Sequence, residues 1–288
     1  MTFLPIITGL LAAFFWGTSD YLVGKPSRAI GQWRATTYVL GFSAIVLLLV
    51  SLYTGIGTKA DASVILLAAL SSIVAFLAFL FAFRAFRYGD LTITAPIVGT
   101  YPAIAAIGAV FILGETISGP EAAAIAAIIA GIVLLSTRLS ALRRRKKIVA
   151  SGIGSAILSM LFFGGTAIFA GAYAVVIGVV LLSLMWRSIS AGIGFVAGYA
   201  TRQDVSVPQR KYLPSIVMAG ITDAFGVLAF VYGIVASSTL PIVASLAGFA
   251  GGVTAIYAFA LLKERPEPSQ WLGILLAVAG VVVLSYIA

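Results

Sequence analysis

The chain has 288 residues, of which 61% are hydrophobic and 9% are charged, whereas an ordinary soluble domain has about 25% charged residues. Its mean hydropathy of +1.14 excludes a soluble enzyme, a nucleic-acid-binding domain and a disordered chain, because too few polar residues remain to cover a water-exposed surface. The net charge is +9, from 18 Lys and Arg against 9 Asp and Glu, and the sequence contains neither cysteine nor histidine. Disulfides, thiolate chemistry and histidine-ligated zinc are therefore excluded.

Ten apolar segments are each long enough to cross about 30 Å of hydrocarbon as a helix, which takes about 20 residues. In chain order they are 4–23, 33–53, 63–83, 91–113, 121–137, 150–170, 179–200, 213–233, 240–262 and 270–287. Because these runs are long and continuous rather than short and alternating, they indicate helices and not the strands of a transmembrane barrel.

Glycine, proline and charged residues separate most of these spans. The first break is expected at Gly24, Lys25 and Pro26, whereas no charged residue marks the boundary within 170–180. A cleaved signal peptide has a basic region before its apolar core. No Lys or Arg precedes Leu4, so we expect the first span to be retained.

Sixteen of the 18 basic residues fall in the five connections that lie on one side of a ten-helix chain. They are Lys25, Arg28, Arg34, Arg84, Arg87, Arg138, Arg143, Arg144, Arg145, Lys146, Lys147, Arg202, Arg210, Lys211, Lys263 and Arg265. Lys and Arg mark the cytoplasmic side of a membrane protein. We therefore expect a multi-pass protein of the plasma (cell) membrane, with these loops in the cytoplasm and both termini outside. Lys59 and Arg187 are left for the other side or for the membrane interior.

The two halves of the chain share a spaced pattern. Glu115 precedes Gly131 by sixteen residues, and Glu264 precedes Gly280 by the same number. Further matches pair Pro96 with Pro241, Trp33 with Trp186, Arg34 with Arg187 and Trp16 with Phe163. Chance recurrence of Ala, Ile, Val and Gly is the alternative, but the shared register argues against it.

The pattern predicts two five-helix units, residues 1–137 and 150–288, joined by a basic linker over 138–149. An odd number of crossings places the second unit upside down in the membrane. Transporters built from such inverted repeats bind their substrate near the bilayer midplane, between the repeats. The predicted fold is thus an all-α integral membrane protein, with ten transmembrane helices in two inverted five-helix repeats around a central cavity.

Ten helices in two halves, each with a Glu followed by Ala-Gly and an apolar run, resemble the drug/metabolite transporter superfamily and, within it, the EamA-type permeases. The resemblance covers nearly the whole chain. It implies a cavity lined mainly by spans one to four and six to nine, with spans five and ten as supports. It also implies export or exchange of small metabolites such as amino acids. One departure is that the segment from Pro241 to Glu264 is about one helical turn longer than its counterpart.

Asp223 lies near the middle of the eighth span, where inserting a carboxylate costs at least about 2.5–3.5 kcal/mol. It should therefore face the cavity or a partner. The functional interpretation is a proton-coupling group or a binder of a substrate ammonium, and the alternative is a structural ion pair or hydrogen bond. Arg187 is a candidate partner that could instead bind a substrate carboxylate, or extend to the nearer interface.

Asp20 and Trp16 share one face of the first span, one turn apart. This face is a candidate lining of the cavity entrance, although a solvated helix end explains Asp20 equally well. Aromatic side chains are further candidates to stack on a flat ligand, with interfacial belts as the alternative. These are Tyr38, Tyr101, Phe163, Trp186 and Tyr257, of which Tyr101 and Tyr257 lie inside their spans.

Three prolines occupy the repeat-related fourth and ninth spans. Pro96 and Pro102 interrupt the fourth, and Pro241 opens the ninth. The backbone groups that they free are tolerated in a membrane only where other partners satisfy them. We interpret these positions as hinges or parts of a ligand site, with a static kink as the alternative.

These patterns favour a secondary active transporter, an exporter or exchanger of a small polar metabolite, that works by alternating access. The expected partners are a small-molecule substrate, a proton as the candidate coupling ion, and the lipid bilayer; no nucleic acid, cofactor or metal is expected. A non-transporting scaffold or accessory subunit is the alternative. A membrane-embedded enzyme is disfavoured, because no nucleophile–base pair or metal cluster is visible.

Overall fold

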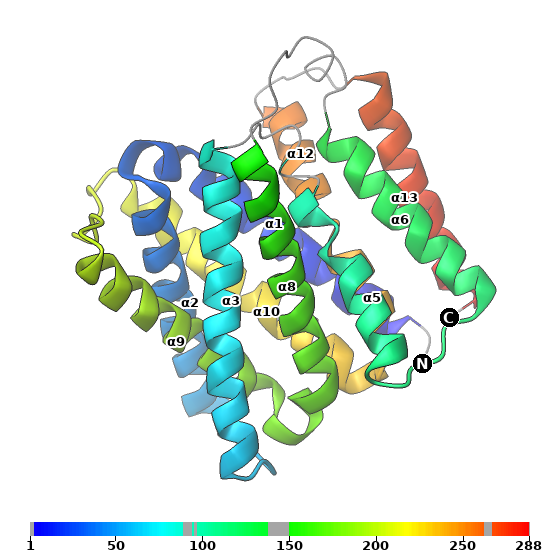
Figure 1. Cartoon of the computed structure of the whole chain (residues 1–288), viewed down its shortest axis with the longest axis horizontal. Helices are drawn as coiled ribbons and strands as arrows, with labels where there is room; N and C mark the ends of the chain where they lie inside the picture. The colour runs from blue at the N-terminus through cyan, green and yellow to red at the C-terminus, as the bar shows by residue number, and fades with distance from the viewer. Residues whose placement is uncertain (1–2, 89–93, 95–96, 138–149, 262–266, 288) are drawn as a thin grey trace.

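Helices form nearly all of the structure, a computed structural model that describes residues 3–88, 94, 97–137, 150–261 and 267–287 (Figure 1). Six helices are long and apolar enough to cross a membrane: α1 (Leu4–Ile30), α2 (Gln32–Thr54), α3 (Ala62–Tyr88), α8 (Ala150–Ile177), α9 (Val179–Ala200) and α10 (Leu213–Ser237). The others have shorter apolar stretches: α5 (Tyr101–Phe111), α6 (Gly119–Ser136), α11 (Leu240–Ala247), α12 (Ala250–Leu261) and α13 (Pro268–Ile287). The predicted all-α membrane architecture is confirmed over these residues.

The first helix is longer than predicted. It continues through Gly24, Lys25 and Pro26 and ends at Gly31, whose φ of 88° is accessible to glycine but strained for other residues. An interior proline lacks an N–H and its ring crowds the carbonyl of residue i−4, but α1 continues past Pro26, and the Ser27 hydroxyl donates to the Gly24 carbonyl in this turn. The expected break at Gly24 is therefore wrong.

The boundary between the sixth and seventh spans lies at Gly178, with φ 93° and ψ 147°. Its conformation is nearly that of Gly31, with φ 88° and ψ 145°, which separates α1 from α2. The sequence lacked a charged marker here because a single glycine makes the turn. The first connection in each half is thus made by a single glycine with a positive φ.

The fourth and ninth spans are each interrupted. In the fourth, a turn at Thr100 precedes α5, and the Thr100 hydroxyl donates to the Ile97 carbonyl. In the ninth, α11 and α12 are separated at Gly248 and Phe249. Side-chain hydroxyls that bond nearby carbonyls offset the hydrogen bonds lost at such interruptions.

A close pair of helices, α6 and α13, lies beside the other helices (Figure 1). Gly131 of α6 faces α13 so closely that an added Cβ would be 2.7 Å from the Gly273 oxygen and from the Ala277 nitrogen. Gly280 of α13 faces Ala124 of α6 in the same way. Small residues let membrane helices approach to this distance, where dispersion forces hold them.

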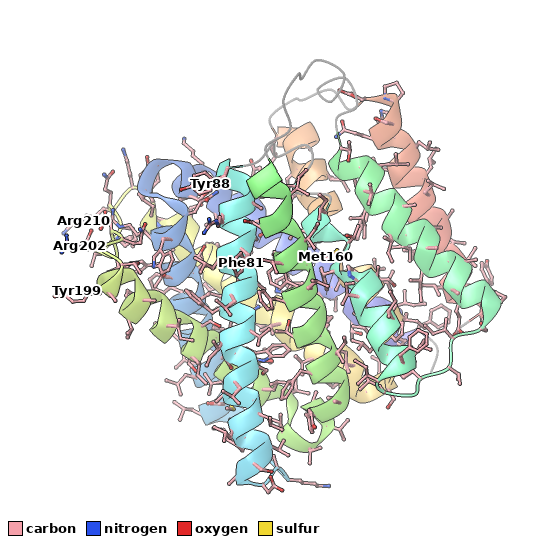
Figure 2. The ribbon with its side chains drawn as sticks, viewed as in Figure 1. Phe81, Tyr88, Met160, Tyr199, Arg202 and Arg210 are labelled. Carbon is pink, nitrogen blue, oxygen red and sulfur yellow. The ribbon has the colours of Figure 1, made fainter. Side chains whose placement is uncertain are left out.

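The two ends of the bundle differ. Both termini lie at one end, whereas the start of α8 and the end of α12 lie at the other (Figure 1). The connection between α9 and α10 projects from the helices and carries Arg202 and Arg210 (Figure 2). The predicted basic linker 138–149 lies outside the described residues.

Candidate functional site

A cavity of about 300 Å³ lies among α1, α3, α8, α9 and α10 and the interruptions of the fourth and ninth spans. Among the described lining residues, α6 contributes Ile132, and α2 contributes none. The expected division into lining and supporting helices is therefore wrong in part. The reason is that α2 packs on the outer side, against α9 and α10.

Arg187 of α9 and Asp223 of α10 form a buried ion pair on the cavity wall. The Arg187 Nε donates to Asp223 Oδ2 over 2.5 Å, and Nη2 donates to Oδ1 over 3.0 Å. The two residues are only 5% and 6% exposed. Two parallel bonds of this kind are the strong geometry for arginine and carboxylate. Arg187 thus extends to a partner inside the protein and not to the membrane interface.

Neighbouring polar contacts hold α9 in place. The Trp186 Nε1 donates to the Ser71 hydroxyl of α3 over 2.9 Å, and the Ser190 hydroxyl donates to the Ser72 carbonyl over 3.1 Å. These buried bonds fix the rotation of α9 against α3. They leave Arg187 directed toward α10 and the cavity.

Asp20 also lines the cavity, but it is exposed there and unpaired. No hydrogen bond or ion pair to its carboxylate is found among the described residues, and it interacts electrostatically with the Asp223 carboxylate, which lines the same cavity. Two carboxylates that face one cavity repel each other when both are ionised. Within the described part of the chain, the site therefore contains one acid that is neutralised by arginine, Asp223, and one acid without a counter-ion, Asp20.

Three polar bonds determine which face of α1 reaches the cavity. The Ser19 hydroxyl donates to the Ala219 carbonyl of α10 over 2.9 Å. On the other flank, the Thr254 hydroxyl of α12 donates to the Gly17 carbonyl over 3.0 Å, and Thr18 shares a 3.1 Å hydrogen bond with Tyr257. With α1 held between α10 and α12, Asp20 is left on the cavity side.

Aromatic side chains cover much of the wall. Of the predicted aromatic residues, Trp16, Tyr101, Phe163 and Trp186 line the cavity. Trp16 packs on Phe230 with ring centroids 5.3 Å apart, and Phe163 packs edge-on against Phe79 at 5.0 Å. Such offset and edge contacts keep the rings rigid and leave faces free for a ligand.

Two predicted aromatic residues lie elsewhere. Tyr38 donates to the Val205 carbonyl in the α9–α10 connection over 3.3 Å, and Tyr257 stacks on Tyr21 at 5.1 Å. Neither is among the lining residues. Tyr38 lies too near the end of α2 to reach the cavity. Tyr257 lies in the interior of its span, as predicted, but on the side of α12 that faces α1.

The match between Arg34 and Arg187 does not extend to their positions in the structure. Arg34 lies three residues after Gly31, whereas Arg187 lies nine residues after Gly178. Arg34 therefore sits at the helix end, where it pairs with Asp204 over 2.7 Å and donates to the Ser206 carbonyl. By contrast, Trp16 and Phe163 lie fifteen residues before these same glycines and both line the cavity.

Of the predicted hinge prolines, Pro102 lies two residues after the interruption at Thr100, and Pro241 lies at the start of the ninth span and not at its interruption. Pro102 and Pro241 are each the second residue of a helix, α5 and α11, where a missing N–H costs nothing. Pro96 lies outside the described residues. The interruption of the ninth span is instead at Gly248, whose added Cβ would be 2.6 Å from Pro102 Cγ. The two broken spans thus meet beside the cavity.

The comparisons with known proteins agree with this architecture. The model of the EamA-like transporter family matches residues 3–137 and again residues 150–286. The chain belongs to the EamA-like transporter family. A crystal structure described only as that of a protein has a TM-score of 0.81 and 15% identity, and the alignment covers 99% of this chain and 98% of the other. At that identity the likeness shows the fold alone. No curated protein sequence matches the chain.

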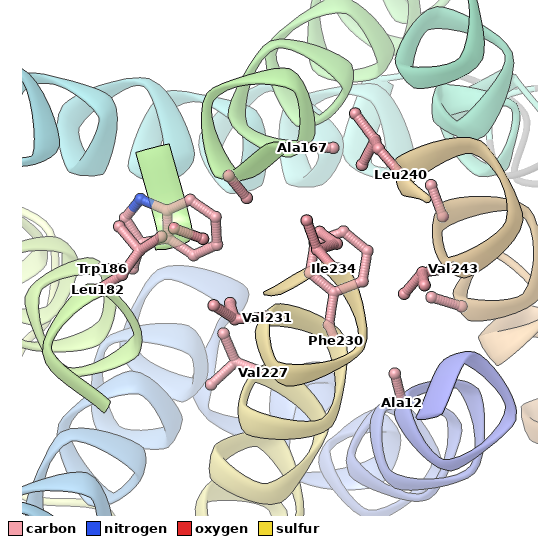
Figure 3. Close-up of a cluster of buried hydrophobic side chains, with 14 of the residues drawn as sticks. Ala12, Ala167, Leu182, Trp186, Val227, Phe230, Val231, Ile234, Leu240 and Val243 are labelled. Carbon is pink, nitrogen blue, oxygen red and sulfur yellow. The ribbon is translucent and has the colours of Figure 1, made fainter. Parts of the chain in front are cut away.

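In this EamA-like protein, buried apolar side chains fill the helix bundle next to the cavity (Figure 3). In this view, Phe230 and Ile234 of α10 lie between Val231 on one side and Val243 and Leu240 on the other. The same cluster includes Ile177 at the end of α8, so it extends toward the end of the bundle that carries the termini. Apart from the aromatic Trp186 and Phe230, its members are small or branched, which permits dense packing.

Glu115 connects the two halves of this family member outside the membrane-spanning helices. Its half-buried carboxylate accepts a hydrogen bond from the Leu240 backbone N–H, at the start of α11. Burial raises the pKa of Glu115, and this bond opposes the rise. A carboxylate at a helix N-terminus satisfies a free N–H group. Glu264, its sequence counterpart, lies outside the described residues.

Several lining residues were not predicted from the sequence. Phe79, Phe230 and Gly248 belong to long apolar runs and carry no charge that distinguishes them. Phe230 lies seven residues after Asp223, or two turns along the same helix face. That spacing was the available signal, and it also finds Val227 on the wall.

Proposed function

We propose that this protein is a secondary active transporter of the cell membrane that exports or exchanges a small polar metabolite of about amino-acid size. The observation that carries the proposal is the cavity bounded by two interrupted spans, which holds Asp20, Arg187 and Asp223. Interrupted helices around a central site are typical of secondary transporters. Ionisable groups at membrane depth most often mark substrate or ion pathways.

The proposed mechanism is alternating access by two inverted repeats. In support, α1 starts at the end with the termini and α8 starts at the opposite end (Figure 1). The matched glycines Gly31 and Gly178 are further support. By the positive-inside rule, the basic connections support a cytoplasmic location for the end near Arg202.

We further propose that the structure represents a state that is closed toward the termini. The buried cluster around Ile234 and Leu240 closes that end, whereas Asp20 is exposed on the cavity wall nearer the basic end. Rocking of the repeats about the contact of Gly248 with Pro102 would open the apolar cluster and close the basic end.

Asp223 is the proposed coupling residue. Protonation of its carboxylate, or binding of a substrate charge, would release Arg187 and loosen α9 from α10. Asp223→Asn should therefore abolish pH-driven flux in proteoliposomes. Unchanged pH-driven flux in this variant would rule out the coupling role.

The transport function itself is tested with the purified full-length protein. A thermal-shift screen with amino acids, amines, sugars and nucleotides identifies a ligand, and counterflow in proteoliposomes then measures its exchange. The proposal predicts uptake that is accelerated by unlabelled ligand inside the vesicle. A ligand that binds in the cavity but does not cross the membrane would favour a scaffold or accessory subunit.

A further inference from the structure

The three charged side chains on the described cavity wall do not balance. Arg187 and Asp223 neutralise each other through two hydrogen bonds. Among the described residues Asp20 has no such partner, so their ionised side chains give the cavity wall one net negative charge. Because Asp20 is exposed on the cavity wall, its carboxylate is open to a ligand, and a cationic ligand can form a charge-assisted hydrogen bond with it.

The position of Asp20 suits it to bind a ligand cation. Its helix is fixed by the bonds from Ser19 to α10 and from Thr254 to α1, so the carboxylate is presented without a rearrangement of the backbone. Trp16 lies one turn away on the same face. An aromatic ring next to a carboxylate adds a cation–π contact for an organic ammonium.

The remainder of the wall suits a flat apolar group. Tyr101 and Phe163 are 6.0 Å apart between centroids, and both line the cavity with Trp186. The volume of about 300 Å³ is at the small end of ligand sites. It matches one aromatic ring with a short side chain.

Resting on the proposed transport function, we propose that the substrate is a monocationic arylalkylamine, with its ammonium on Asp20 and its ring among Trp16, Tyr101 and Phe163. A zwitterionic amino acid of the same size would leave the net negative charge in place. It would also bring a carboxylate toward Asp20 and Asp223. Arg187 is the group that would favour such a carboxylate, and its Nε and Nη2 are already bound to Asp223.

Ligand selectivity of the unmodified protein provides the first test. Calorimetry on full-length protein compares phenethylamine, phenylalanine, 2-phenylethanol and phenylacetate, which share a ring and differ in charge. We expect phenethylamine to bind at least tenfold more tightly than phenylalanine, with phenylacetate the weakest. Equal or tighter binding of phenylalanine would overturn the proposal.

Substitution of Asp20 provides the second test. Asp20→Asn should weaken phenethylamine binding at least tenfold and leave 2-phenylethanol binding unchanged. Asp20→Glu should retain most of the affinity, and Asp61→Asn, a control at the exposed start of α3, should retain all of it. Unaltered amine binding in Asp20→Asn would refute the assignment. If that variant does not fold, the selectivity of the unmodified protein decides.

The two proposals fail in different ways. If phenylalanine binds more tightly and is exchanged in counterflow, the transport function stands and the amine assignment is wrong. If phenethylamine binds through Asp20 but no flux is measured, the assignment stands and the transport function is wrong.

Discussion

The Arg187–Asp223 pair offers the sharpest test of the site's energetics. Its two hydrogen bonds, 2.5 and 3.0 Å long, join groups that are almost completely buried. Asp223→Asn leaves Arg187 buried with a neutral partner, and breaking a buried pair in this way costs about 3–5 kcal/mol. Replacing both residues by apolar ones of similar size, Arg187→Met with Asp223→Leu, removes both charges and should recover most of that loss.

The measurement is the free energy of unfolding in mixed micelles of the unmodified protein, Arg187→Met, Asp223→Leu and the double variant, which together form a double-mutant cycle, with Asp223→Asn measured beside them. Asp204→Asn is the matched control, because the Asp204 side chain in the pair with Arg34 is 60% exposed, and it should lose far less than Asp223→Asn. The reasoning would be refuted if Asp223→Asn lost less than about 1 kcal/mol, the level of a surface pair. Counterflow with the double variant then distinguishes a structural role of the pair from a coupling role. If stability is restored but transport is not, the pair takes part in coupling.

Three further predictions follow from the packing, the surface charges and the topology. Gly131→Ala should destabilise the protein by about 1–3 kcal/mol, because its Cβ would meet the α13 backbone at 2.7 Å; Gly192→Ala, with no atom within 4 Å, should cost nothing in the same unfolding assay. The pKa of Asp204 is lowered by hydrogen bonds from Ser206 and by Arg34. Its contribution to stability is therefore complete above the ordinary pKa of about 3.9 and is lost as the pH falls through the lowered value. The melting temperature of Asp204→Asn should thus lie below that of the unmodified protein at pH 7, and this difference should shrink toward pH 3; a constant difference would contradict the assignment. In intact cells, an impermeant thiol reagent should label Lys59→Cys but not Arg202→Cys, and the reverse result would invert the proposed topology.

The helices were predictable because each needs only a long apolar run, and composition supplies that signal directly. The ends of the helices were less predictable. Pro26 marks a break in the sequence, yet α1 continues past it, and Gly178 gave no charged signal, yet its positive φ ends a helix. A single glycine turn within apolar residues cannot be distinguished from a glycine used for packing without the backbone conformation.

The site was predictable where a residue was chemically unusual for its depth. Asp223 and Arg187 stood out as charges in a membrane span, and the structure brings them together. Tyr38 and Tyr257 did not reach the cavity, because residue type does not reveal the rotation of a helix. The position of Asp20 on the cavity wall likewise depends on three bonds that α1 makes with helices far away in the sequence.

The central claim, that one cavity opens alternately to the two sides of the membrane, is tested most directly by cysteine accessibility. The chain has no cysteine, so Thr166→Cys places a single thiol on the cavity wall against a silent background. In right-side-out and inside-out vesicles, alternating access predicts that an impermeant thiosulfonate modifies this thiol from either side, and that a bound ligand slows both reactions. Modification from one side only would contradict the account.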